Sequence, residues 1–218
     1  EHVGWHGVFG LALVPVALAW FVFLFLAAEP PRPAVATRSS LRALLAEPDA
    51  RWLCGFYAMT FGSFVGLSGY LAIFFVDRFD LSKVTGASFA ALCAVAGSLL
   101  RPVGGAVADR LGGTRVLGGV MAAAAVLAAV LGLQPGLAFT VMLLATLLGV
   151  LGMGNGAVFQ LVGVRMPSRV GAMTGLVGAA GGLGGFALPF LFGWLRGRSG
   201  GFATGFELLA TVAMVSAL

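Results

Sequence analysis

The sequence predicts an all-α fold, a polytopic bundle of helices that cross a membrane. Hydrophobic residues make up 60% of the 218 residues and charged residues only 10%, whereas a soluble domain carries about 25% charge. The mean hydropathy is +1.03. Seven apolar segments have about the length that crosses a hydrocarbon core of ~30 Å: roughly 7–28, 52–76, 84–108, 116–133, 137–164, 171–195 and 202–218.

The first apolar segment is set apart from the other six by a long polar connection rich in Pro and Arg. Such a linker is a candidate boundary between two helix bundles. We therefore expect 1–28 to be one helix of a first bundle, 29–51 a linker, and 52–218 a six-helix bundle. Within the linker, SSLRALLAEP at 39–48 predicts either a short surface helix capped by a serine or a solvated stretch.

The remaining connections are short turns. Gln134-Pro135-Gly136 permits only a tight hairpin, so the segments before and after it should be antiparallel neighbours. The sequence starts with Glu1 rather than Met and ends at Leu218 inside an apolar run. These two ends predict a fragment of a longer protein, truncated within its last segment.

The distribution of basic residues predicts an orientation in the membrane. The net charge is +5, and 12 of the 13 basic residues lie in loops or at segment ends, which fits the positive-inside rule better than nucleic-acid binding. With the loop 29–51 in the cytoplasm, four basic residues face outward: Arg78, Lys83, Arg196 and Arg198. Eight face the cytoplasm: Arg32, Arg38, Arg42, Arg51, Arg110, Arg115, Arg165 and Arg169.

Arg101 belongs to neither side, because it is the one charged residue of the segment 84–108. It lies eight positions before Asp109, or about 12 Å from the expected cytoplasmic boundary. An arginine at that depth costs roughly 2.5–3.5 kcal/mol, unless its side chain reaches back to the membrane surface. No complete apolar segment supplies an acidic partner, so Arg101 predicts an anion site. The guanidinium fork suits nitrate, nitrite, a carboxylate or a phosphate.

Aromatic and small residues form the other candidate parts of this site. Tyr57 and Phe61 share one helical face at a spacing of i, i+4, and their rings either wall a flat anion or simply pack. Two glycine-dense stretches, GMGNGAVFQLV at 152–162 and GLVGAAGGLGGFALP at 175–189, allow the close approach of a ligand or of another helix. Asn155 adds a polar amide inside the first stretch.

No enzyme, metal site or cofactor is expected. Both histidines, His2 and His6, lie near the start, and Cys54 and Cys93 lie within apolar segments as packing residues. The GxG spacings do not follow a strand, so a dinucleotide site is excluded by context.

The turn GAVADRLGGTR at 105–115 resembles the G-x-x-x-D-R-x-G loop signature of the major facilitator superfamily. Together with LLRPVGGAVADRLGG, FYAMTFGSFVGLSGY and the two glycine stretches, it makes the chain similar to the nitrate/nitrite porters of that superfamily. The resemblance implies the C-terminal half of the fold plus the last helix of the N-terminal half, in the plasma (inner) membrane. It implies a gating role for five residues of the turn: Gly105, Asp109, Arg110, Gly112 and Arg115.

The resemblance also implies alternating-access transport of nitrate or nitrite, by antiport or by proton symport. The apolar segments contain few protonatable side chains, which favours nitrate/nitrite exchange over proton symport. The missing N-terminal half would supply a second arginine and a second glycine segment. Substrate-binding residues implied here are Arg101, Tyr57, Phe61, Asn155, Gly154, Gly156, Gly178, Gly181 and Gly182.

Two alternatives remain open. The same fold can export another small organic anion or a drug. The helix count also allows a seven-helix receptor-like protein, although a retinal protein needs a lysine within a helix and the only one, Lys83, lies in a loop.

Overall fold

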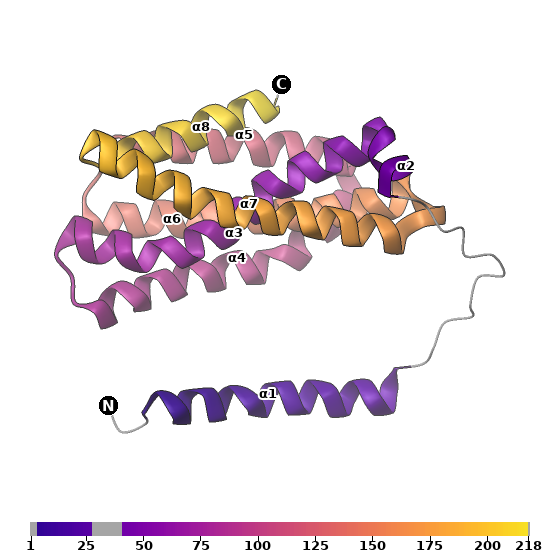
Figure 1. Ribbon diagram of the computed structural model, residues 1–218, viewed down its shortest axis with the longest axis horizontal. Helices are drawn as coiled ribbons and strands as arrows, with labels where there is room; N and C mark the ends of the chain where they lie inside the picture. Colours follow the sequence, from indigo (N-terminus) through magenta and orange to yellow (C-terminus); the bar gives the residue numbers. More distant parts are fainter. Residues whose placement is uncertain (1–3, 28–40, 218) are drawn as a thin grey trace. The chain divides into compact units, whose positions relative to one another are not determined.

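The computed structural model describes residues 4–27 and 41–217, and these are helical with short turns (Figure 1). The expected all-α class is confirmed. The chain divides into two units, Glu1–Arg38 and Ser39–Leu218. The first unit contains α1 (Trp5–Leu26), whose apolar side chains from Val8 onward are exposed. A helix that is apolar on all sides is suited to lipid or to a larger bundle.

The second unit is a helical bundle. Its elements are α2 (Leu41–Ala46), α3 (Pro48–Phe79), α4 (Lys83–Leu111), α5 (Gly113–Gly132), α6 (Leu137–Arg165), a 3₁₀ turn (Pro167–Arg169), α7 (Val170–Ser199) and α8 (Ala203–Ala217). Every predicted apolar segment is therefore a helix. Among the described residues, six helices are long and apolar enough to cross a membrane, and α8 is a shorter apolar helix.

The linker differs from its expected form at its end. The helix α3 begins at Pro48 rather than at 52, because proline fits the first helical position, where no intrahelical N–H bond is made. The short helix α2 shows that the helical alternative holds for the described part of 39–48. The expected serine cap lies outside the described residues.

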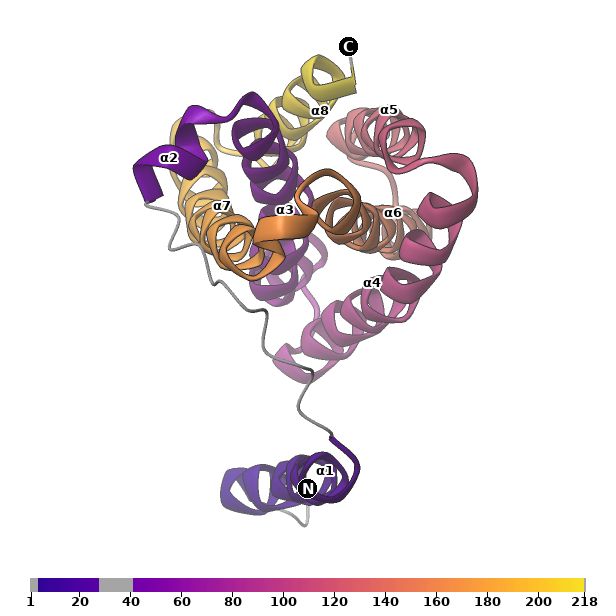
Figure 2. The same cartoon turned by 90° about the vertical axis from the view of Figure 1, so that its right-hand side faces the viewer.

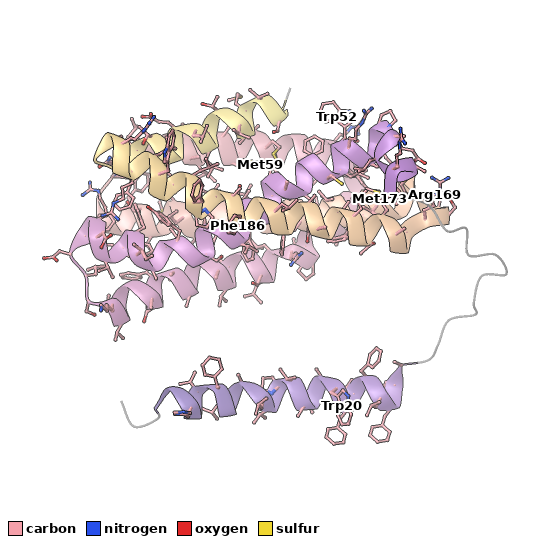
Figure 3. All side chains as sticks on the ribbon, in the orientation of Figure 1. Trp20, Trp52, Met59, Arg169, Met173 and Phe186 are labelled. Carbon is pink, nitrogen blue, oxygen red and sulfur yellow. The ribbon has the colours of Figure 1, made fainter. Side chains whose placement is uncertain are left out.

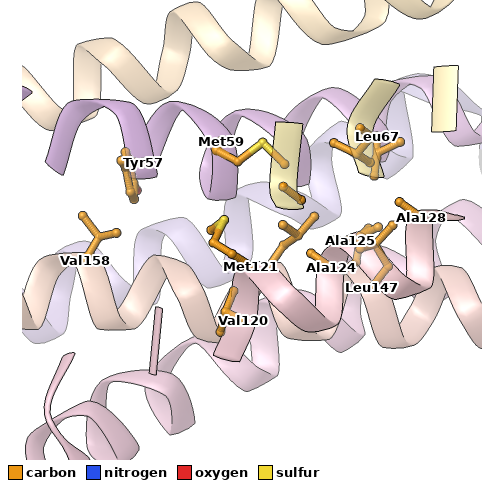
Figure 4. Packing of buried hydrophobic residues seen from close by; sticks show 14 of the residues in the cluster. Tyr57, Met59, Leu67, Val120, Met121, Ala124, Ala125, Ala128, Leu147 and Val158 are labelled. Atoms are coloured by element: carbon orange, nitrogen blue, oxygen red, sulfur yellow. The ribbon is translucent and has the colours of Figure 1, made fainter. Parts of the chain in front are cut away.

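Figure 2 shows the bundle end-on, with α4 packed along α6, α3 along α7, and α5 between α6 and α8. The hairpin at Gln134 to Gly136 makes α5 and α6 antiparallel neighbours, as predicted. The core between α3, α5 and α6 is filled by side chains such as Leu67, Met121 and Leu147, all fully buried (Figure 4).

Glycines set the distance between two helix pairs. A Cβ at Gly152 of α6 would overlap the Gly97 carbonyl of α4, and a Cβ at Gly62 of α3 would lie 2.7 Å from backbone atoms of Gly184 in α7. Backbones can approach this closely only where side chains are absent. The glycine stretches therefore allow close approach, as predicted, and at these positions the approaching group is a neighbouring helix.

Ion pairs tie α3 to its neighbours at both ends. At one end Arg165 donates to Asp49 at 3.0 Å, and Arg169 pairs with Glu47. Arg169 lies at the end of the bundle where α7 begins (Figure 3). At the other end Arg196 of α7 donates to Asp77 of α3 at 2.5 Å. An ion pair therefore connects α3 and α7 near each of their ends, Arg169 with Glu47 and Arg196 with Asp77.

We expect Arg196→Gln to lower the free energy of unfolding by no more than about 1 kcal/mol, because solvent-exposed ion pairs contribute little. Both partners are about one-third exposed. Thermal unfolding of the full-length protein in detergent, beside Arg198→Gln on the same helix end, measures the effect. A loss above about 3 kcal/mol would instead place the pair in a buried network.

Candidate functional site

Arg101 and Tyr57 meet between α4 and α3. A terminal nitrogen (Nη2) of Arg101 donates a hydrogen bond to the Tyr57 hydroxyl oxygen at 2.6 Å. The guanidinium carbon also lies over the Phe61 ring, 5.0 Å from its centroid. Tyr57 is buried and Arg101 is half-buried. The structure therefore brings together the three residues that the sequence singled out.

The rings of Tyr57 and Phe61 stack on one another. Their centroids are 4.9 Å apart and their planes are within 5° of parallel. The i, i+4 spacing on α3 accounts for this stack, because residues four apart lie one above the other on a helix. The guanidinium thus lies over the Phe61 ring of this stack and bonds to the hydroxyl group of Tyr57.

Phe159 of α6 also contacts this aromatic pair and was not identified from the sequence. Its ring meets the Tyr57 ring edge-on, with a centroid distance of 4.9 Å and an interplanar angle of 73°. The one signal available in the sequence is the spacing from Asn155, four residues earlier on the same face of α6.

The glycines predicted to bind substrate fall into three groups. Gly181 of α7 lies against the aromatic pair, because a Cβ there would be 2.5 Å from Tyr57 Cδ1 and 2.8 Å from Phe61 Cδ1. Gly178 and Gly182 have no atom within 4 Å of a built Cβ among the described residues, so they lie away from the rings.

Gly154 and Gly156 lie at helix contacts. A Cβ at Gly154 would be 2.7 Å from the Thr60 methyl group, and one at Gly156 would overlap the carbonyl oxygen of Arg101. Gly156 therefore brings the α6 backbone directly against the α4 backbone at the arginine.

Asn155 lies between these two glycines and is completely buried. Both polar atoms of its amide lack a hydrogen-bond partner in the described part of the chain. An unsatisfied buried polar group costs about 1–3 kcal/mol. Asn155 shares the helix face of Phe159, so its amide belongs to the side of α6 that meets Tyr57.

The stretch 105–115, expected to be a turn, is instead the last part of α4 and the first residues of α5, with Gly112 alone between the two helices. Gly112 has a φ of +89°, which a residue without Cβ adopts readily. Asp109 and Arg110 are exposed. Within the described residues Asp109 forms no ion pair with Arg110 or Arg115.

Arg101 supplies the positive charge of this site. The ion pairs formed among the described residues involve other arginines, so the Arg101 charge has a phenol and a ring as neighbours rather than a carboxylate. A guanidinium carries five N–H donors, and one is directed to Tyr57. No group of three or more His, Cys, Asp or Glu residues in the described part could hold a metal.

Comparison with known proteins places this chain in a family. The Major Facilitator Superfamily model matches residues 1–189. The chain is 32% identical over 218 residues to the nitrite extrusion protein of Bacillus subtilis (strain 168), covering 99% of this chain and 55% of that protein. It is 37% identical over 182 residues to the probable nitrate/nitrite antiporter NarK1 of Thermus thermophilus, covering 75% and 41% of the two chains. The chain thus spans about half the length of the curated relatives it matches.

A solved structure agrees on the fold. The transporter FucP, in its outward conformation, superposes with a TM-score of 0.73 at 16% identity, over 95% of this chain and 52% of that one. The resemblance to nitrate/nitrite porters drawn from the sequence motifs is confirmed by the relatives. The chain belongs to the Major Facilitator Superfamily and is a multi-pass protein of the plasma membrane.

Proposed function

We propose that this chain is the C-terminal part of a secondary transporter that moves nitrate, nitrite or both by alternating access. One observation carries the proposal: the half-buried Arg101 guanidinium lies between the apolar helices α4 and α3, hydrogen-bonded to Tyr57 at 2.6 Å and without a carboxylate partner in the described residues. A cation in that setting is stabilised by an anionic substrate. The names of the relatives supply the candidates nitrate and nitrite.

The geometry suits a small flat anion. The guanidinium is a planar fork that donates two parallel hydrogen bonds to two oxygens of an oxyanion. Because the Tyr57 oxygen accepts from Arg101, its own proton is free to donate to the same anion. The rings of Tyr57 and Phe61 stack on one another, so a planar anion would bind at the fork beside them rather than between them. Asn155, with a buried and unpartnered amide, is a further polar group on this side of α6.

The glycines Gly154, Gly156, Gly178, Gly181 and Gly182 contribute in different ways under this proposal. Gly156 lets the α6 backbone lie against α4 beside Arg101, Gly154 lies against α3 and α5, and Gly181 leaves room for the aromatic pair. Gly178 and Gly182 leave an open strip of α7, which is suited to the substrate or to the other half of the transporter.

The missing half completes the site. We assign α1 to the end of the N-terminal bundle, 29–51 to a cytoplasmic linker, and 52–218 to the C-terminal bundle. The excess of basic residues on that side, eight against four, supports the orientation. Halves of this kind rock about a site near the membrane midplane, and the turn with Gly105, Asp109, Arg110, Gly112 and Arg115 would move with them as a gate element.

The proposed cargo is tested by competition. Uptake of labelled nitrate into proteoliposomes with the full-length protein should fall when unlabelled nitrate or nitrite is added, and should be unaffected by equal concentrations of acetate or a cationic drug. Competition by acetate but not by nitrite would instead favour an organic-anion exporter of the same fold. None of the ion pairs among the described residues involves Arg101, which favours exchange over proton symport, so uptake should need nitrite inside the vesicles rather than a proton gradient.

Tyr57→Phe should raise the half-saturating nitrate concentration roughly 10-fold, because the lost hydroxyl is a hydrogen-bond partner of a charged group. The phenyl ring preserves the stack on Phe61, so the amount of folded protein should stay unchanged. Initial rates over a range of nitrate concentrations measure the effect. A half-saturating concentration equal to that of the wild type would remove the hydroxyl from the site.

A further inference from the structure

We propose that Phe159 is a positioning residue that keeps the Tyr57 hydroxyl on the Arg101 guanidinium, so that α6 sets the spacing of the anion site. This inference rests on the proposed function, since the site it concerns is the proposed anion site. Phe159 itself needs no contact with the anion. It acts through the Tyr57 ring, which it meets edge-on at 4.9 Å.

The first step of the argument is the confinement of the Tyr57 ring. Phe61 covers it by stacking, Phe159 contacts it edge-on, and Gly181 leaves space for it on the side of α7. The hydroxyl oxygen is the atom of the side chain farthest from Cβ, so a small rotation of the ring displaces it most. Edge-to-face contacts hold a ring at a defined angle, and loss of the Phe159 edge frees that rotation.

The second step is that α6 contacts both partners of the hydrogen bond. Gly156 brings the α6 backbone against the carbonyl oxygen of Arg101, and Phe159, three residues later, contacts Tyr57. Residues three apart lie on one face of a helix. The same face of one rigid helix therefore locates the donor on α4 and the acceptor on α3, whose 2.6 Å separation depends on both contacts.

The test uses the full-length protein in proteoliposomes. Phe159→Leu should raise the half-saturating nitrate concentration roughly 3–10-fold, the range of an aromatic pair contact, with little change in the maximal rate. Phe159→Tyr keeps the ring and should behave like the wild type. Phe139→Leu removes an exposed phenylalanine elsewhere on α6 and serves as the matched control. If Phe159→Leu is not recovered folded, Phe159→Met is measured against the same expectation.

A double-mutant cycle separates positioning from general packing. In a Tyr57→Phe background there is no hydroxyl to position, so Phe159→Leu should change the half-saturating concentration less than twofold further. Independent, multiplicative effects of the two substitutions would overturn the inference. An unchanged value for Phe159→Leu alone, in a protein whose nitrate transport requires Arg101, would overturn it while leaving the proposed function intact. Absence of nitrate transport by the wild type would instead overturn the proposed function.

Discussion

Arg101→Ala should reduce nitrate and nitrite binding by the full-length protein about 100-fold or more. Removing one partner of a desolvated charge pair typically costs 2–5 kcal/mol, and the described residues around Tyr57 offer no second cation that pairs with the anion. Arg101→Lys keeps the charge but loses the planar fork and its contact over Phe61. We therefore expect the lysine variant to bind roughly 10-fold more weakly than the wild type.

Equilibrium binding of labelled nitrate to purified protein measures both variants. Arg198→Ala is the matched control. It removes an arginine that packs on Trp194 near the end of α7 and has no part in the contact of Arg101 with Tyr57. All three variants should insert into the membrane and unfold at temperatures near that of the wild type, since a charge in an apolar segment such as that of Arg101 does not stabilise the fold and Arg198 is exposed in the last turn of α7. Near-normal binding by Arg101→Ala would exclude this residue from the site.

Gly152→Ala should destabilise the folded protein by about 1–3 kcal/mol or prevent its accumulation in the membrane. The added methyl group would overlap the Gly97 carbonyl oxygen, a backbone atom that cannot turn aside. Overpacking of a close helix contact forces the backbones apart at a cost of this size. Because α4 and α6 also meet at Gly156 and Arg101, part of the anion site should be disturbed with them.

Gly163→Ala is the control for that experiment, because Gly163 lies on the same helix and a Cβ there has open space. Thermal unfolding and size-exclusion profiles in detergent compare the two variants. The control should match the wild type or exceed it slightly, since alanine is the better helix former. Equal stability of both variants would show that the α4–α6 contact tolerates a wider spacing.

The fold was predictable from the sequence to the extent that hydropathy and length decide it. A helix that crosses lipid must be apolar over about 20 residues, so the membrane spans can be predicted from hydropathy and segment length. The proximity of Tyr57 and Phe61 could also be predicted, because the i, i+4 spacing places both residues on one helical face. The depth of Arg101 in the membrane stays a prediction from its distance of eight residues to Asp109 along α4.

The roles of the glycines were not predictable, because a stretch that is rich in glycine on all sides does not show which face meets which neighbour. Gly154 contacts α3 and α5, whereas Gly156, two residues later, contacts α4. Phe159 was missed for the same reason: an aromatic residue in an apolar run is indistinguishable from packing until the partner helix is placed. The start of α3 at Pro48 shows that a proline in a polar linker can mark a helix start.

The most direct test of the account is nitrite-driven counterflow of labelled nitrate in proteoliposomes that contain the full-length protein, without a proton gradient. Vesicles loaded with nitrite should accumulate labelled nitrate transiently, and the same vesicles with Arg101→Ala should not. If the wild type moves no nitrate under these conditions, nor when a proton gradient is added, the chain keeps its place in the superfamily but the assignment of nitrate and nitrite as its cargo is wrong.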